Sequence, residues 1–235
     1  MNPPVSLADD KQAFELHERQ IVERIFTAVM EQRLVPKTKL SEAALCEAFG
    51  VGRMRVRRAL LLLANQGIVD LKSNKGAFVA CPDSRDAKEV FDARCIIEPG
   101  IVRALCIDMS EDAQVRLARH LEKENDARVQ DGRTELIRLF GEFHIELAKA
   151  TENSFLIKQM RELIARTSLI VGLFGKGRQS TCPEDEHHGI LLAIFEKEPE
   201  AAVRMMVRHL RHIEDALDLT VTSAGQYDIA DILRI

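Results

Sequence analysis

Apolar residues recur every three or four positions along most of the chain, which is the spacing that buries one face of an α-helix. In the first third, this pattern predicts helices over residues 11–33, 42–49 and 53–66. Val35-Pro36 separates the first two helices, because proline lacks an amide hydrogen and disfavours helix in the residue before it. Gly50-Val51-Gly52 predicts a tight turn before the third helix, and Gly67 predicts its end.

Two short β-favourable segments follow, at residues 68–71 and 77–80, and the polar residues 72–76 between them predict a hairpin turn. Three helices followed by a hairpin are typical of a winged helix-turn-helix. From Ser84 onward the periodicity is helical, and helices are expected near residues 84–107, 110–130, 133–151, 153–175, 183–197 and 199–222.

The expected fold is therefore mostly α, with two domains that meet near Pro82-Asp83-Ser84. Residues 1–82 should form an N-terminal winged helix-turn-helix. Residues 83–235 should form a C-terminal all-helical antiparallel bundle of about six helices, followed by a short tail from Ser223.

The charge of the chain is unevenly distributed between these two parts. The formal net charge is −4 over 235 residues, from 33 Lys+Arg and 37 Asp+Glu. The segment from Lys11 to Pro82 has 12 basic and 7 acidic residues, a balance of +5, so the remaining residues carry −9. Because a basic segment attracts phosphate, nucleic acid is the natural partner of the N-terminal part.

Composition and apolar runs exclude other classes of protein. With 46% hydrophobic and 30% charged residues, a largely disordered chain is not expected. The longest purely apolar runs are six residues, far short of the roughly 18 that a membrane span needs. No basic stretch leads into an apolar one near Met1, so no secretory signal is expected. The five cysteines form no CxxC pair, which fits a cytoplasmic protein without a membrane partner.

Basic side chains gather at the start of the third helix and on the hairpin turn: Arg53, Arg55, Arg57, Arg58, Lys72 and Lys75. The start of a recognition helix enters the major groove, where an arginine fork can bind guanine or a phosphate. A wing carrying lysines would meet the DNA backbone or the minor groove. Four arginines on one helix also occur on plain solvated surfaces, but the order of helices and the basic hairpin favour DNA binding.

Five segments resemble the DNA-binding domain of GntR-family bacterial transcription regulators: Pro36–Leu40, Leu45–Val51, Arg53–Leu60, Leu63–Val69 and Gly76–Val79. That family usually reads Ser-Arg-Thr-Pro-Val-Arg-Glu-Ala-Leu across the recognition helix. The resemblance implies that Arg53 and Arg57 contact DNA and that Gly76 is the wing-tip glycine. This chain departs from the pattern in four places: Lys37 for Gly, Gly52 for Ser, Met54-Arg55 for Thr-Pro, and Arg58 for Glu. Because of these departures, the resemblance implies the binding mode but not the operator sequence.

Three histidines in the second half lie on the apolar stripes of three different predicted helices: His144, His187 and His209. Facing the interior of one bundle, they could converge, and neutral imidazoles in a bundle core are common metal ligands. The alternative is that each is a hydrogen-bonded structural residue of the core. His120 has charged residues three or four positions away and is predicted to be exposed.

The second half also resembles the FCD effector domain of the FadR branch, on the motifs around Arg94–Glu98, Phe143-His144, Glu186-His187 and His209-Leu210. In that family the domain is an all-helical dimer that binds small organic acids, often beside a metal held by three histidines and one acidic residue. His144, His187 and His209 match the histidines, but Phe140 stands where the acidic ligand is expected. Two interpretations stay open. Either three histidines hold a zinc-like divalent metal with water or effector completing the shell, or the pocket is metal-free.

Arg94 lies on an apolar stripe one helical turn from Glu98, and a buried guanidinium needs an anionic partner. Arg94 either forms an internal ion pair with Glu98 or binds the carboxylate of an effector. Both residues, together with the three histidines, are therefore candidate effector-binding residues.

These features predict a ligand-responsive bacterial transcription regulator rather than an enzyme. We expect a repressor that binds a palindromic double-stranded DNA operator as a homodimer and responds to a small metabolite, an organic acid or similar anion. One alternative is a metal-dependent hydrolase that uses the three-histidine site. It leaves the basic winged domain unexplained. The other is a DNA-binding protein without a ligand, against which the inward polar groups of the helical domain argue.

Overall fold

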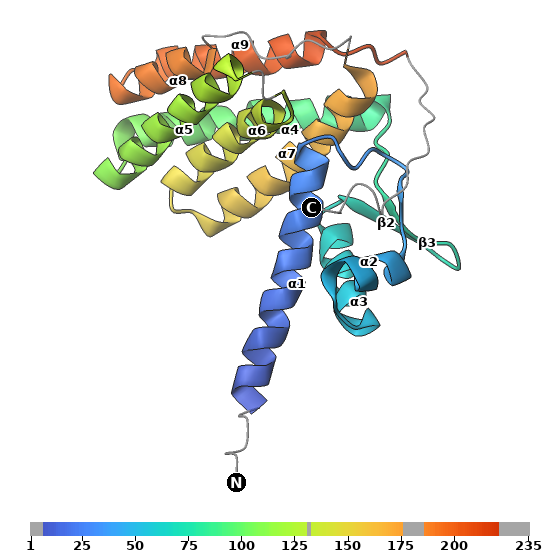
Figure 1. Cartoon of the computed structure of the whole chain (residues 1–235). Helices are drawn as coiled ribbons and strands as arrows, with labels where there is room; N and C mark the ends of the chain where they lie inside the picture. The colour runs from blue at the N-terminus through green and yellow to red at the C-terminus, as the bar shows by residue number, and fades with distance from the viewer. Residues whose placement is uncertain (1–6, 131–132, 176–185, 221–235) are drawn as a thin grey trace. The chain divides into compact units, whose positions relative to one another are not determined.

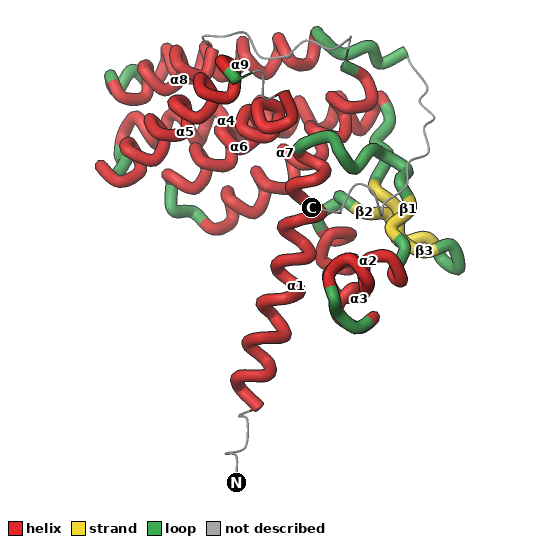
Figure 2. Tube along the Cα trace, viewed as in Figure 1, coloured by secondary structure: helices red, strands yellow, loops and turns green. Residues whose placement is uncertain are grey.

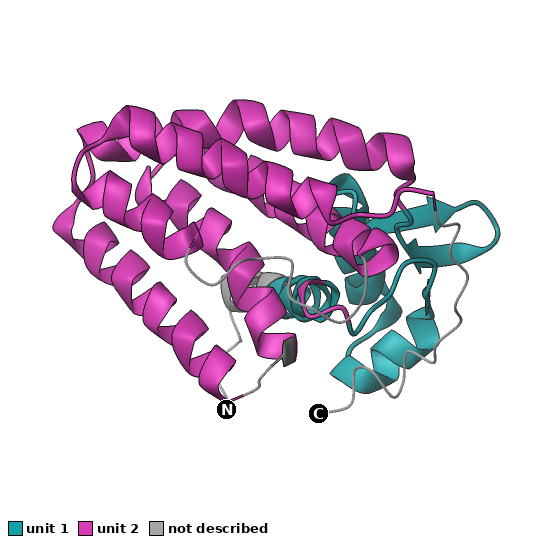
Figure 3. Ribbon diagram, turned by 90° about the horizontal axis from the view of Figure 1, so that it is seen from above, with its two compact units in different colours: residues 1–29, 33–81, 224–235 teal, residues 30–32, 82–223 magenta. Residues whose placement is uncertain are grey.

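A computed structural model describes residues 7–130, 133–175 and 186–220. The described residues form two compact units, shown in different colours in Figure 3. The first contains residues 7–29 and 33–81, and the second contains residues 30–32, 82–130, 133–175 and 186–220. Within these ranges, no helix is both long and apolar enough to cross a membrane.

The first unit is a three-helix domain with a small sheet (Figures 1 and 2). Its helices are α1 (Leu7–Met30, of which Met30 belongs to the second unit), α2 (Glu42–Phe49) and α3 (Arg53–Asn65). Its strands are β1 (Lys39–Leu40), β2 (Val69–Lys72) and β3 (Gly76–Val79), arranged antiparallel in the order β1-β3-β2. The sequence did not predict β1, because two residues are too short to show a strand periodicity.

Local chemistry explains where these elements begin and end. The Ser41 side chain accepts a hydrogen bond from the Ala44 amide and caps α2, as the sequence predicts. Gly50 ends α2 in the left-handed region at φ +63°. The hairpin pairs Lys72 with Gly76, which has φ +94°, a conformation that a side chain would strain. The predicted winged helix-turn-helix is confirmed.

The second unit is helical throughout the residues that the structure describes. Its helices are α4 (Ser84–Ile107), α5 (Glu111–Val129), α6 (Arg133–Ala150), α7 (Ser154–Phe174), α8 (Glu186–Phe195) and α9 (Pro199–Asp215). Helix α4 packs most extensively against α9 and also contacts α6, α7 and α8. The side chains of Asp83, Ser110 and Asn153 cap α4, α5 and α7.

Among the described residues, three helix termini differ from the sequence prediction by more than two residues. One is the start of α1, which lies at Leu7 rather than residue 11. Helix α1 ends at Met30 rather than residue 33, because the amides of Arg33 and Leu34 both donate to the Ala28 carbonyl and close the helix. Helix α9 ends at Asp215 rather than residue 222. Beyond it, the Asp218 amide donates to the Phe174 carbonyl, which pairs this segment with the end of α7. The predictions for residues 183–185 and for the tail 223–235 lie outside the described residues.

Candidate functional site

The four predicted DNA-binding arginines of α3 differ in their surroundings. Arg57 donates through Nε to both carboxylate oxygens of Glu42 in α2, at 2.9 and 3.0 Å. Arg58 pairs with Glu18 of α1 at 3.5 Å. Arg53 is exposed and shows no carboxylate partner among the described residues, whereas Arg55 is half-buried. Arg53, at the start of the helix, could therefore contact DNA without first breaking an ion pair with a carboxylate of the described residues.

The start of α3 and the hairpin both suit a polyanion. Gly52 provides no side-chain cap, and the first turn of α3 has no acidic residue, so its amides retain their partial positive charge. On the hairpin, Lys72, Lys75 and Gly76 are all exposed. The Lys72 ammonium lies over the Phe78 ring, 5.2 Å from its centroid.

Three helices of the second unit bring the predicted histidines together. His144 lies on α6, His187 on α8 and His209 on α9, and all three are buried. The Nε2 atom of His209 is 3.2 Å from Nε2 of His187 and 3.2 Å from Nε2 of His144. One nitrogen from each ring thus faces a common point, and the ligand atoms lie within 4.8 Å of one another.

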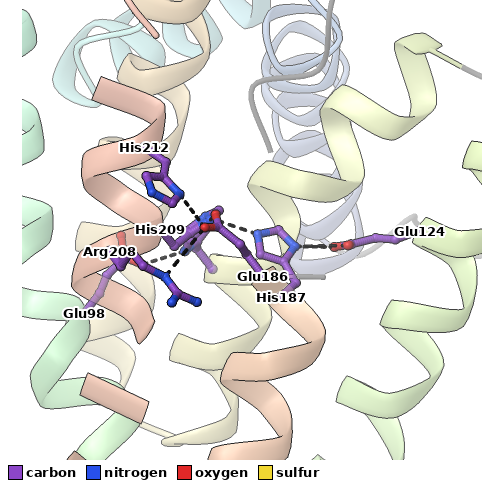
Figure 4. Close-up of polar contacts among 8 residues, drawn as sticks. Glu98, Glu124, Glu186, His187, Arg208, His209 and His212 are labelled. Atoms are coloured by element: carbon purple, nitrogen blue, oxygen red, sulfur yellow. Dashed lines mark hydrogen bonds and ion pairs between the residues drawn. The ribbon is translucent and has the colours of Figure 1, made fainter. Parts of the chain in front are cut away.

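Each of these histidines contacts a glutamate through its other nitrogen. Figure 4 labels His187 with Glu124 and His209 with Glu186. The Nδ1 contacts are His144 to Glu98 at 2.5 Å, His187 to both oxygens of Glu124 at 3.0 Å, and His209 to Glu186 at 2.8 Å. The sequence analysis named Glu98 but missed Glu124 and Glu186. The position of Glu186 directly before His187 was the one local signal.

These carboxyl groups are held in the ionised form. Burial alone would raise the pKa of Glu98, but the charges of Arg94 and His144 lower it to about 2. Burial would likewise raise the pKa of Glu124. The hydrogen bonds from His120 and His187 have the larger effect and lower this pKa to about 2. The pKa of Glu186 is also lowered, against burial, by its hydrogen bond from His209. An ionised carboxylate only accepts hydrogen bonds, so each histidine donates its Nδ1–H.

Nε2 of His144 and Nε2 of His209 consequently present lone pairs to each other. Burial lowers the pKa of His144 to about 3 and that of His209 to about 4, so both rings are neutral near pH 7. These two lone pairs, 3.2 Å apart, repel unless a cation lies between them. Two nitrogens that bind one tetrahedral zinc at about 2.0–2.1 Å are separated by about 3.3 Å. The donor set, its spacing and the carboxylates behind each ring therefore fit a divalent metal.

Arg94 forms the internal ion pair with Glu98 that the sequence allowed, and it also has one donor without a partner in the described residues. Its Nε donates to Glu98 at 2.6 Å, and its Nη1 donates to Thr167 at 3.3 Å. Its Nη2 is buried and has no hydrogen-bond partner among the described residues. Arg94 also contributes to the lowered pKa values of His144 and His209, so its charge lies close to the histidine cluster. A buried guanidinium N–H without a hydrogen-bond acceptor, close to the three histidines, suits the binding of an anionic ligand.

Phe140, which replaces the acidic residue of the resembled family, is half-buried beside the cluster. Its ring meets His187 edge-on at 5.6 Å, and the Arg128 guanidinium lies 4.8 Å from its centroid. Glu142 does not take its place, because it accepts from Arg138 at 2.8 and 2.7 Å. Three histidine nitrogens are thus the ligand set that the described residues offer.

The prediction that His120 is exposed is wrong. His120 is buried, with Nε2 2.9 Å from the Leu139 carbonyl and 3.3 Å from Glu124. Neighbouring charges misled the sequence interpretation, because Glu124 is itself buried between His120 and His187. The exposed His212 similarly contacts Glu186 at 2.5 Å.

Acid should destabilise the chelator-treated protein, starting below about pH 6.5. In the unfolded chain His144 and His209 take up protons near pH 6.5. In the folded chain their pKa values are about 3 for His144 and about 4 for His209, so they stay neutral to lower pH. The unfolded state therefore binds more protons in this window, and the free energy of unfolding falls by up to about 1.4 kcal/mol per pH unit for each histidine. Glu98 and Glu124 extend the loss from about pH 4.5 to about pH 2.

Thermal unfolding midpoints of the chelator-treated protein between pH 7.5 and 4.5 would measure this effect. A His209→Gln variant serves as the control, and its midpoint should depend less steeply on pH. Unchanged midpoints across this range would contradict the buried neutral histidines.

Comparisons with known proteins agree with both units. The family described as bacterial regulatory proteins, gntR family, matches residues 17–79, and the FCD domain matches residues 89–212. The Nta operon transcriptional regulator of Aminobacter aminovorans is 24% identical over 184 residues, covering 78% of this chain and 87% of that protein. The transcriptional regulator LutR of Bacillus subtilis is 29% identical over 211 residues, covering 78% of this chain and 93% of that protein.

A solved structure with a similar fold is a GntR transcriptional regulator from Rhodococcus sp. RHA1. It superposes with a TM-score of 0.74 at 22% sequence identity, covering 84% of this chain and 95% of that one. At this identity the likeness concerns the fold alone. The similar sequences, by contrast, are named as transcriptional regulators rather than enzymes.

Proposed function

The chain belongs to the GntR family of bacterial transcription regulators with an FCD domain, and from this premise we propose that it is a metabolite-responsive repressor. Residues 1–82 would bind DNA, and residues 83–235 would bind the effector and form a homodimer. The protein would act in the cytoplasm on a palindromic operator, with one winged helix on each half-site. GntR regulators bind DNA, so the proposal concerns the operator symmetry, the effector and the direction of control.

The exposed Arg53 at the uncapped start of α3 is the observation that carries the DNA-binding assignment. In a helix-turn-helix, the N-terminal residues of the recognition helix contact base edges. Arg53 can donate two hydrogen bonds to guanine O6 and N7. Lys72 and Lys75 on the hairpin would contact phosphates, and Arg57 and Arg58 would do so after leaving Glu42 and Glu18.

Replacing Arg53 should weaken specific binding far more than replacing Lys75. The full-length protein would first select its operator from a random double-stranded DNA library. For that operator, Arg53→Ala should raise the Kd about 10- to 100-fold and relax selectivity at one base pair per half-site. Lys75→Ala should weaken binding to all sequences alike and lower the slope of log K against log salt by about one per subunit.

Both substitutions are at exposed positions, so neither removes a core contact. An unchanged operator affinity in Arg53→Ala would refute the docking of α3. If the library enriched no sequence, or one without two-fold symmetry, the palindromic operator itself would be refuted.

The effector site that we propose consists of Arg94, Glu98, His144, His187 and His209. It is supported by the unpartnered Nη2 of Arg94 near three inward-facing histidine nitrogens. His144, His187 and His209 would hold a divalent, zinc-like metal, and a bound metal would offer positions to oxygen atoms of the effector. Arg94 would bind the effector carboxylate through Nη2, and Glu98 would hold both Arg94 and His144 in position.

This arrangement favours a small organic acid with at least one carboxylate. The three side chains that would hold the metal are imidazoles without negative charge, and Phe140 supplies none either. An anionic effector would therefore be attracted by both the metal and Arg94. To control transcription, the effector must bind one pose of the paired DNA-binding domains better than another, since a ligand shifts an equilibrium only by its difference in affinity.

A further inference from the structure

The outward ridge of α3, which we define as Met54, Arg58, Leu61 and Asn65, is the part of the helix furthest from the core. It lies opposite the buried residues Val56, Ala59, Leu60 and Leu63. Met54 is 65% exposed and Leu61 is 53% exposed. Two of the four side chains on this outward ridge, Met54 and Leu61, are therefore apolar and exposed.

The charged neighbours of Met54 are held to either side of it. Arg57 is bound by Glu42 of α2, and Arg58 is paired with Glu18 of α1. These two ion pairs draw the guanidinium groups toward the flanking helices. On the first turn of α3, Met54 is the large apolar side chain that is exposed.

The major groove offers one apolar group to such a side chain, the C5-methyl group of thymine. Methionine is unbranched and polarisable, so it can adjust to a methyl group at the groove floor. Met54 is the second residue of α3, at the end of the helix that enters the groove. Leu61 lies seven residues further along, about 10 Å along the helix axis.

We propose that Met54 reads sequence by packing on the methyl group of one thymine in each operator half-site. The proposal rests on the proposed DNA-binding function and adds a base preference to it. Arg53 would bind guanine beside this position, so each half-site would contain a guanine and a thymine close together. Met54 would thereby distinguish thymine from cytosine, which lacks the methyl group.

Deoxyuridine tests this directly, because it differs from thymine only by the missing methyl group. In the operator selected by the full-length protein, each thymine of both half-sites would be replaced in turn by deoxyuridine. At one symmetric position, the affinity of the wild-type protein should fall about tenfold, or about three- to fourfold for each methyl group. Met54→Ala should bind the thymine operator about tenfold more weakly and lose nothing further with deoxyuridine at that position.

Leu61→Ala is the matched control, since it also removes an exposed apolar side chain from α3. The operator affinity of Leu61→Ala should fall on deoxyuridine substitution by the same factor as that of the wild-type protein. Three results would overturn the role of Met54: an enriched half-site without thymine, wild-type affinity insensitive to every deoxyuridine, or a Met54→Ala variant with undiminished sensitivity. A library that enriches no sequence would instead refute the proposed function together with this inference.

Discussion

Protein purified without an affinity tag or chelator should carry close to one divalent metal ion per chain, and His187→Ala should carry almost none. The reason is the convergence of three buried Nε2 atoms, two pairs of which lie 3.2 Å apart. Removing one of three ligands leaves two, which hold zinc-like ions poorly. Elemental analysis of the purified proteins measures the metal content directly.

His188→Ala is the matched control, because it removes the neighbouring histidine, which is exposed on the same helix. It should retain the wild-type metal content. Glu124→Gln should retain a metal but bind it about 10- to 100-fold more weakly, since Glu124 holds the His187 ring through Nδ1. Wild-type protein free of metal would mean that Phe140 marks a lost site. The histidines and Arg94 would then form a polar pocket that recognises its effector by hydrogen bonds alone.

Arg94→Lys should abolish the response to effector while leaving the fold intact. Lysine can keep the ion pair with Glu98, so no buried carboxylate loses its partner. Its single nitrogen, however, cannot pair with Glu98 and also place a donor where Nη2 of Arg94 lies. A small carboxylate that raises the unfolding midpoint of the wild type would first be identified from a panel of hydroxy- and dicarboxylates. Its Kd should rise at least 100-fold in Arg94→Lys, as isothermal titration calorimetry would measure.

Thr167→Val is the control for this experiment. It removes the acceptor of Nη1, at 3.3 Å, without touching Nη2. The Kd of the same carboxylate should change by less than about tenfold. If Arg94→Lys bound the carboxylate as tightly as the wild type, Arg94 would serve only as the partner of Glu98.

Much of the fold could be predicted from local patterns. The spacing of Val56, Leu60 and Leu63 identified the buried face of α3, and all three are buried. Ser41 and Gly76 marked a helix start and a hairpin turn because capping and left-handed backbone are properties of single residues. The end of α9 was predicted wrongly, because the segment after Asp215 contacts a residue distant in sequence. There the Asp218 amide donates a hydrogen bond to the Phe174 carbonyl.

For the candidate site, too, the sequence predicted the features that depend on local spacing and missed the contacts between helices. Helical spacing alone indicated that His144, His187 and His209 face the interior, because the apolar stripe of a helix defines its buried side. It could not indicate that Glu124 lies behind His187, 63 residues away, or that His120 is buried beside it. Such contacts depend on how far each helix is shifted and rotated against its neighbours, and periodicity does not contain that information.

The sequence by itself therefore determined the two domains' fold classes, the basic start of α3 and the inward orientation of the histidines, since each follows from residue type and spacing. Only the tertiary structure decided which carboxylates engage Arg57, Arg58 and the three imidazoles, and that Nη2 of Arg94 has no partner among the described residues. The physical reason is that ion pairs and hydrogen bonds act over about 3 Å. Their formation depends on packing between helices rather than on the pattern within one.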